Sequence, residues 1–74
     1  MNNERRKILK QAVSLLEQAN ELISGVLDEE QDAFDNMPEG LQMSERGEQI
    51  EENIGTLENI TDELDTFATD LGAL

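Results

Sequence analysis

The sequence predicts an all-α protein: an antiparallel two-helix hairpin that associates with itself into a helical bundle. Apolar residues recur at alternating steps of four and three along two long segments, a heptad pattern typical of coiled coils. Where the two segments meet, the stretch 36–48 holds the only proline and two of the five glycines. We expect a helix over about 3–36, a bend over about 37–44 and a helix over about 45–72, forming one domain over 1–74.

The first helix is expected to start at an asparagine cap, Asn2 or Asn3. Its first apolar seam comprises Ile8, Ala12, Leu15, Ala19, Leu22 and Val26. Its second seam comprises Leu9, Val13, Leu16, Asn20, Ile23, Leu27, Glu30 and Phe34. One partner helix covers only one seam, so this helix needs at least two neighbours. Asn20 either fixes the register of an oligomer or lies solvated at the edge of its seam.

The second helix is expected to start at Ser44, a good N-cap, with acidic residues in its first turns. Its first seam comprises Ile50, Ile54, Leu57, Thr61, Leu64, Ala68 and Leu71. A second seam begins midway and comprises Leu57, Ile60, Leu64, Phe67, Leu71 and Leu74. Since two seams per helix leave apolar surface after one hairpin closes, we expect self-association into a four-helix bundle or docking on another protein.

A hairpin symmetric about Gly40 sets a register between the two helices. It places Leu9 beside Leu71 and Val26 beside Ile54. It also places Gly25 level with Gly55. Two glycines at one level indicate either a close approach of the two backbones or two unrelated, tolerated glycines, because a glycine within a helix costs about 1 kcal/mol relative to alanine.

The formal net charge is −13, and the charges are unevenly placed. Four of the five basic residues lie within residues 1–10, whereas every acidic residue except Glu4 lies after them. Such a field repels phosphate backbones and anionic lipid, so we expect no direct binding of nucleic acid or membrane. A basic protein is the expected partner. The chain has no cysteine and no apolar run long enough to cross a bilayer, and we expect it in the cytoplasm.

The residue types argue against catalysis. His, Cys, Tyr and Trp are absent, and two helices offer little cleft in which a carboxylate pair could act as acid and base. Asp28, Asp32 and Asp35 share one helix face, but they do not match a calcium-loop pattern and are read as solvated. We expect no enzyme, no cofactor and no metal site.

The bend carries a resemblance to a known group of proteins. It reads Asn36-Met37-Pro38-Glu39-Gly40-Leu41-Gln42, followed by Ser44-Glu45-Arg46-Gly47-Glu48. This resembles a pattern in small, acidic, uncharacterised helical proteins of bacteriophages and prophages, which reads Asn-Leu-Pro-Glu-Ser-Leu-Gln and then Ser-Glu-Arg-Gly-Glu. Met37 and Gly40 depart from that form. The resemblance covers about the middle third of the chain and implies a phage setting in a host cytoplasm, with no assigned activity.

Two surfaces are candidates for contact with a partner. The first is an acidic face of the second helix, formed by Glu48, Glu51, Glu52, Glu58, Asp62 and Asp65. The second is the bend, with Met37, Leu41, Met43 and Arg46. The leading hypothesis is a non-enzymatic protein–protein interaction module, an acidic inhibitor or nucleic-acid mimic that docks on a basic host protein. The alternatives are a structural or assembly protein that acts by homo-oligomerisation and, for the acidic face, an ordinary solvated surface.

Overall fold

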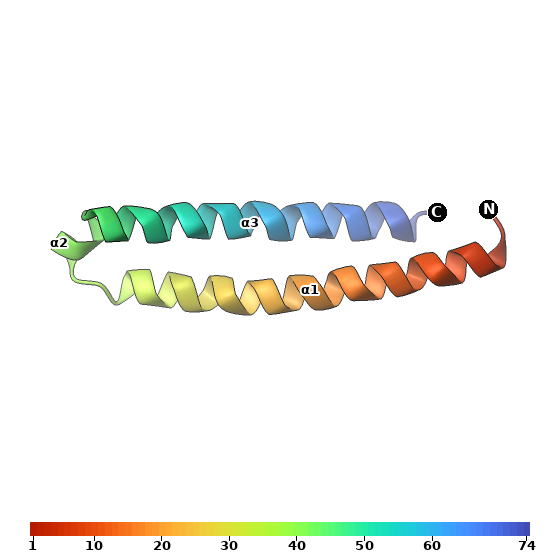
Figure 1. The fold of residues 1–74 in the computed structure, drawn as a ribbon, viewed down its shortest axis with the longest axis horizontal. Coiled ribbons are helices and arrows are strands. Elements are labelled where there is room, and N and C mark those ends of the chain that lie inside the picture. The colour runs from red at the N-terminus through yellow and green to blue at the C-terminus, as the bar shows by residue number, and fades with distance from the viewer.

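The computed structural model describes residues 1–74 and contains three helices and no strand. The helices are α1 (Asn3–Asp35), α2 (Glu39–Gln42) and α3 (Glu45–Gly72). The two long helices, α1 and α3, lie side by side, with the short α2 at one end and both chain termini at the other (Figure 1). The Cα atoms extend over 58 × 14 × 12 Å, so the molecule is a thin rod.

The start of α1 follows the predicted capping. The side-chain oxygen of Asn2 accepts a hydrogen bond from the backbone N–H of Arg5 at 2.9 Å. This bond satisfies one of the donors that the first turn of a helix leaves free. At the other end, the backbone N–H of Asn36 donates to the carbonyl of Asp32 at 3.0 Å, and Pro38 soon afterwards prevents the helix from continuing. The last turn has no basic residue, so the helix dipole there is not offset.

The segment between the long helices contains a helical turn where the sequence analysis expects only a bend. Pro38 precedes α2 with φ −55°, the angle that its ring imposes. Its carbonyl accepts hydrogen bonds from the backbone N–H groups of Leu41 at 2.8 Å and Gln42 at 3.0 Å. The proline therefore ends one helix and starts the next, because its missing N–H is not needed in a first turn. Ser44 then caps α3 as predicted, accepting from the N–H of Gly47 at 3.4 Å.

The interface between α1 and α3 is formed by the second predicted seam of the first helix and the first predicted seam of the second. Only one apolar residue in it, Ile54 at 8% exposure, is buried. The other members are half-buried, namely Leu9, Val13, Leu16, Asn20, Ile23, Leu27, Glu30 and Phe34 on α1, and Ile50, Leu57, Thr61, Leu64, Ala68 and Leu71 on α3. One chain thus buries little apolar surface, and burial is the main term that stabilises a fold.

The predicted register is wrong by about one helical turn, because Asn20 bonds to Asp65. Leu9 and Leu71 still line one small cavity, which also includes Val13. Val26, however, lies with Leu57, while Ile54 lies with Phe34. The symmetric register assumed an unstructured bend centred on Gly40, and the helical turn of α2 changes how the chain crosses between the long helices.

The predicted close approach at Gly25 and Gly55 is wrong. A Cβ atom on either glycine would meet no atom within 4 Å. The close approach lies instead at Gly47, in the first turn of α3, where a Cβ atom would collide with the backbone carbonyls of Gln42 and Leu41. Gly47 is buried against α2, so the absence of a side chain there allows the two helices to meet.

Candidate functional site

An apolar face remains uncovered along one side of the rod. Leu22 is 74% exposed, Leu15 64% and Ile8 62%, and Phe67 on the other long helix is 53% exposed. We define the apolar face as Ile8, Ala12, Leu15, Ala19, Leu22 and Val26 on α1, Ile60 and Phe67 on α3, and Leu74 just beyond the end of α3. On α1 it is the first predicted seam, and on the α3 side it consists of the members of the second predicted seam that are not part of the interface with α1.

The two halves of the apolar face lie on the same side of the molecule. Val26 lines one groove together with Asn53. Seven residues further toward the bend, Ala33 and Arg46 occur together in a second groove. On α1, residues 12, 19, 26 and 33 repeat at intervals of seven, as do residues 46, 53, 60 and 67 on α3. Residues at this interval form one line along a helix in such a packing, so the two lines run beside each other.

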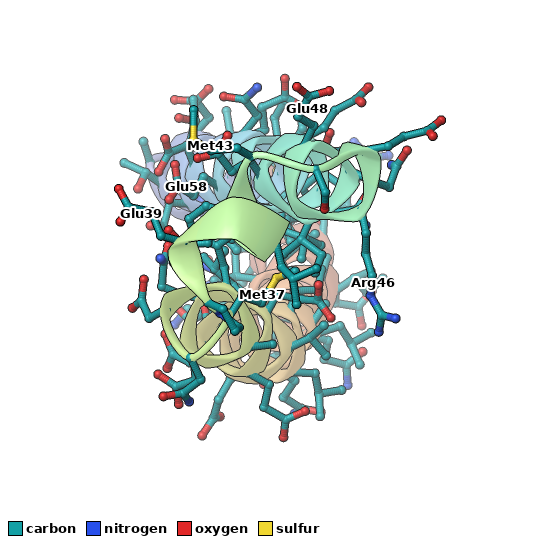
Figure 2. The ribbon with its side chains drawn as sticks, turned by 90° about the vertical axis from the view of Figure 1, so that its left-hand side faces the viewer. Met37, Glu39, Met43, Arg46, Glu48 and Glu58 are labelled. Atoms are coloured by element: carbon teal, nitrogen blue, oxygen red, sulfur yellow. The ribbon has the colours of Figure 1, made fainter.

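The opposite side of the rod carries the predicted acidic face. Glu51 and Glu58 line a groove with Gln31 and Phe34, away from the grooves that contain Val26 and Ala33. Asp65 continues the same line at an interval of seven, and Glu48, Glu52 and Asp62 lie on the adjoining outer surface of α3. All six side chains are exposed. In the view along the rod from the bend, Glu58 and Arg46 lie on opposite sides of the ribbon (Figure 2).

Asn20 links the two long helices on the acidic side. Its side-chain N–H donates to a carboxylate oxygen of Asp65 at 2.7 Å. Its own amide oxygen is buried and has no hydrogen-bond partner. The interpretation of Asn20 as a solvated edge residue is therefore wrong, because the side chain faces α3 and is half-buried there.

The four predicted bend residues are divided between two sides of the molecule. Met37, Leu41 and Arg46 line one groove with Ala33 and Ile50, on the side of the apolar face. Met43 lies on the other side, in a groove with Phe34, Gln42, Glu48 and Glu51. It is 78% exposed, the highest value among the exposed large apolar residues. Figure 2 shows Met37 between the long helices and Met43 beside α3.

Several residues of the bend motif have structural roles that sequence reasoning did not find. The side-chain N–H of Gln42 donates to the carbonyl of Phe34 at 2.9 Å, which ties α2 to the end of α1. The Ser44 hydroxyl contacts the carbonyl of Leu41 as well as capping α3. Together with Pro38 and Gly47, these residues fix the path of the backbone through the bend, which gives the motif a structural role. The position of Gly47 in the first turn of a predicted helix was the one sequence feature that could have indicated this close contact.

The remaining chemistry is sparse. No group of three or more His, Cys, Asp or Glu side chains is placed to hold a metal ion, and Asp28, Asp32 and Asp35 are all exposed. None of the three helices has a stretch that is both long and apolar enough to pass through a bilayer.

Comparison of the chain with protein-family models, with curated proteins and with solved structures gives no match.

Proposed function

We propose that this chain is a non-enzymatic protein–protein interaction module: an antiparallel helical hairpin that uses its apolar face to form a helical bundle. The observation that carries the proposal is the exposure of one side of α1. The large aliphatic side chains there, Ile8, Leu15, Leu22 and Val26, are each at least half exposed. A contiguous exposed apolar surface of this kind is typical of a contact site. The heptad spacing of its members favours a helix as the covering element.

The acidic face favours a second contact, with a basic protein. Glu51, Glu58 and Asp65 point away from the apolar face, so they stay exposed when that face is covered. Glu58, Asp62 and Asp65 follow one another at steps of four and three, and such helix-surface neighbours are about 5–6 Å apart, close to the spacing of phosphates along a nucleic-acid strand. We propose on this basis an acidic inhibitor that occupies a groove built for nucleic acid. The resemblance of the bend to phage and prophage proteins supports a partner from the host cytoplasm.

The competing function is structural. A chain that only assembles with itself uses the apolar face in the same way and leaves the acidic face solvated. The two functions differ in what the carboxylates do. Contact with a basic protein depends on them and is screened by salt, whereas self-association brings together chains of net charge −13 and is therefore favoured by salt.

The test is a capture experiment with tagged chain and host lysate at low and high salt. The inhibitor function predicts retention of a nucleic-acid-binding protein at low salt, its release by high salt, and its displacement by added DNA or RNA. The matched variant is Glu51→Gln/Glu58→Gln/Asp65→Asn, which keeps side-chain size and should lose the captured protein. Capture that is indifferent to salt and to this variant contradicts the inhibitor function. Leu15→Lys tests the apolar face separately, and unchanged contacts with any protein contradict its proposed use.

A further inference from the structure

We propose that the occupant of the apolar face is a second copy of this chain, related by a two-fold axis that lies beside Phe67 and runs perpendicular to the rod, so that each α1 packs antiparallel on the other α1. This inference rests on the proposed use of the apolar face in protein contact and names the partner and its orientation. Four helices result, two from each copy, and each α1 gains the second neighbour that its two seams require.

The seam on α1 is complementary to itself when reversed. Its four inner members alternate between small and large side chains, from Ala12 through Leu15 and Ala19 to Leu22, and Ile8 and Val26 flank them. A two-fold axis midway between Leu15 and Ala19 sets each inner large residue against a small one and the two flanking β-branched residues against each other. Leu15 then faces Ala19 of the second copy, Leu22 faces Ala12 of the second copy, and Ile8 faces Val26 of the second copy. Interdigitation of large and small side chains fills the space between two helices without voids.

The next position at each end of this seam is charged, and the two charges are opposite. Continuing the alternating steps toward the N-terminus reaches Arg5, and continuing toward the bend reaches Glu29. Both side chains are exposed in the single chain. The same two-fold axis places Arg5 of one copy against Glu29 of the other, twice in the dimer. A parallel arrangement places Arg5 against Arg5 and Glu29 against Glu29, and such like-charge contacts disfavour the wrong orientation.

The exposed line on α3 locates the same axis independently. Ile60 and Phe67 lie on α3, and Leu74, at the next interval of seven, lies just beyond its end, so Phe67 is the middle member of the three. The level of Phe67 along the rod follows from contacts between the helices, since Val13 shares a cavity with Leu71 and Asn20 bonds to Asp65. Phe67 therefore lies level with the stretch of α1 between Leu15 and Ala19.

The centres of the two exposed lines thus coincide, although each is fixed by different residues. With one axis, Phe67 meets Phe67 of the second copy and Ile60 meets Leu74 of the second copy. In such an isologous contact the same surface serves both partners, so one line of side chains must be complementary to itself, as both lines are here. The acidic face lies on the far side and is not covered by this contact.

Charge reversal at the ends of the seam tests the orientation. We expect Arg5→Glu and Glu29→Arg each to raise the dimer dissociation constant about tenfold, because each single change creates two like-charge contacts. The double variant Arg5→Glu/Glu29→Arg should restore the dimer. Both reversals suit the helix dipole of α1, with a carboxylate near its start and a guanidinium near its end, so unfolding would not explain a loss. Sedimentation equilibrium measures the dissociation constant, and circular dichroism checks the helices.

Thiol cross-linking supplies a second readout, since the chain has no cysteine of its own. Arg5 and Glu29 are about 36 Å apart along α1, so a short cross-linker cannot join them within one chain. A mixture of Arg5→Cys and Glu29→Cys chains should give cross-linked heterodimers. Each variant alone is the control and should give little product.

The outcomes separate this inference from the proposed function. Restoration by the double reversal together with heterodimeric cross-links supports the antiparallel dimer. Efficient cross-linking of Arg5→Cys alone indicates a parallel contact and overturns it. A well-folded monomer at millimolar concentration also overturns the dimer. That result leaves the proposed function intact, because the apolar face then serves for contact with another protein, which Leu15→Lys tests. A dimer that survives Leu15→Lys unchanged overturns the proposed function itself.

Discussion

The bend and the long helices of this protein are stabilised in different ways. At the bend, Gln42 bonds to the end of α1 and Gly47 meets backbone carbonyls directly, so individual residues fix the geometry. Along α1 and α3 the contacts are aliphatic, nearly all half-buried, and repeat at heptad spacing. The bend is thus specified within one chain, whereas the long helices leave one apolar side exposed, the side that we propose a second copy covers. A change at the bend should act on the single chain, and a change on the apolar face should act on assembly.

The largest expected effect comes from charging the apolar face. We expect Leu15→Lys/Leu22→Lys to abolish self-association, raising the dimer dissociation constant at least a hundredfold, because each lysine would have to be desolvated in an apolar contact. Helicity at low concentration should change little, since both side chains are exposed in the single chain. Sedimentation velocity across a concentration series measures the loss.

The control for this variant is Glu17→Lys. Glu17 is exposed on the same helix but lies off the apolar face. It changes the charge in the same direction and should leave the dimer intact or slightly stronger. If Glu17→Lys disrupts the dimer as much as the double leucine variant, the contact surface is not the apolar face.

The next effect separates the two kinds of glycine. Gly47→Ala should destabilise the folded chain by about 1–3 kcal/mol, the usual range for overpacking, because its new methyl group collides with the carbonyls of Gln42 and Leu41. Gly55→Ala should do the opposite. Its methyl group meets nothing within 4 Å, and alanine in a helix gains about 0.5–1 kcal/mol over glycine. Thermal melts at equal protein concentration measure both changes, and equal shifts would contradict the close approach at Gly47.

These two regions also differ in how far the sequence predicts them. The heptad spacing predicts both long helices and both apolar lines, because the period of the apolar residues alone determines which ones share a face. The caps at Asn2 and Ser44 follow from local chemistry in the same way. The turn of α2 cannot be predicted in this way, because a single helical turn has no periodic pattern. Pro38 is also compatible with both a loop and the start of a helix.

The interactions that cross between elements were also hard to predict. A symmetric register places Gly25 level with Gly55 and makes a close approach there one of two interpretations, whereas the backbone contact at Gly47 depends on the path of α2. The partner of Asn20 depends on the same register, since Asp65 lies opposite it only after the chain has crossed. The sequence pattern predicts which residues share a face of each helix. The path of the chain through α2 determines which residues of those faces are in contact.

A smaller effect is expected at the contact between α2 and α1. Gln42→Ala removes the hydrogen bond of 2.9 Å to the Phe34 carbonyl and should destabilise the chain by about 1 kcal/mol. That carbonyl keeps the N–H of Met37, at 3.1 Å, so it is not left without a donor. Self-association should be unchanged when corrected for folding. A loss of assembly in this variant would show that the bend and the apolar face are coupled.

The smallest effect on stability, and the one that sharpens the comparison most, is expected at Asn20. Asn20→Leu removes a buried amide oxygen that has no partner and places an apolar side chain in the seam, while exposed Asp65 regains water in place of the lost bond. Replacing such a polar group by an apolar one is close to neutral or stabilising, so we expect a gain of up to about 1 kcal/mol in a thermal melt.

The gain should come with a loss of specificity, because the hydrogen bond to Asp65 is the one side-chain bond that joins the middle of the two long helices. Cysteines introduced at Leu9 and Leu71 measure that register. They should cross-link efficiently in the chain that keeps Asn20 and less completely in the leucine variant. If Asn20→Leu is destabilising, the hydrogen bond to Asp65 stabilises the fold by more than the unpaired amide oxygen destabilises it. The long helices are then fixed by individual residues, as the bend is.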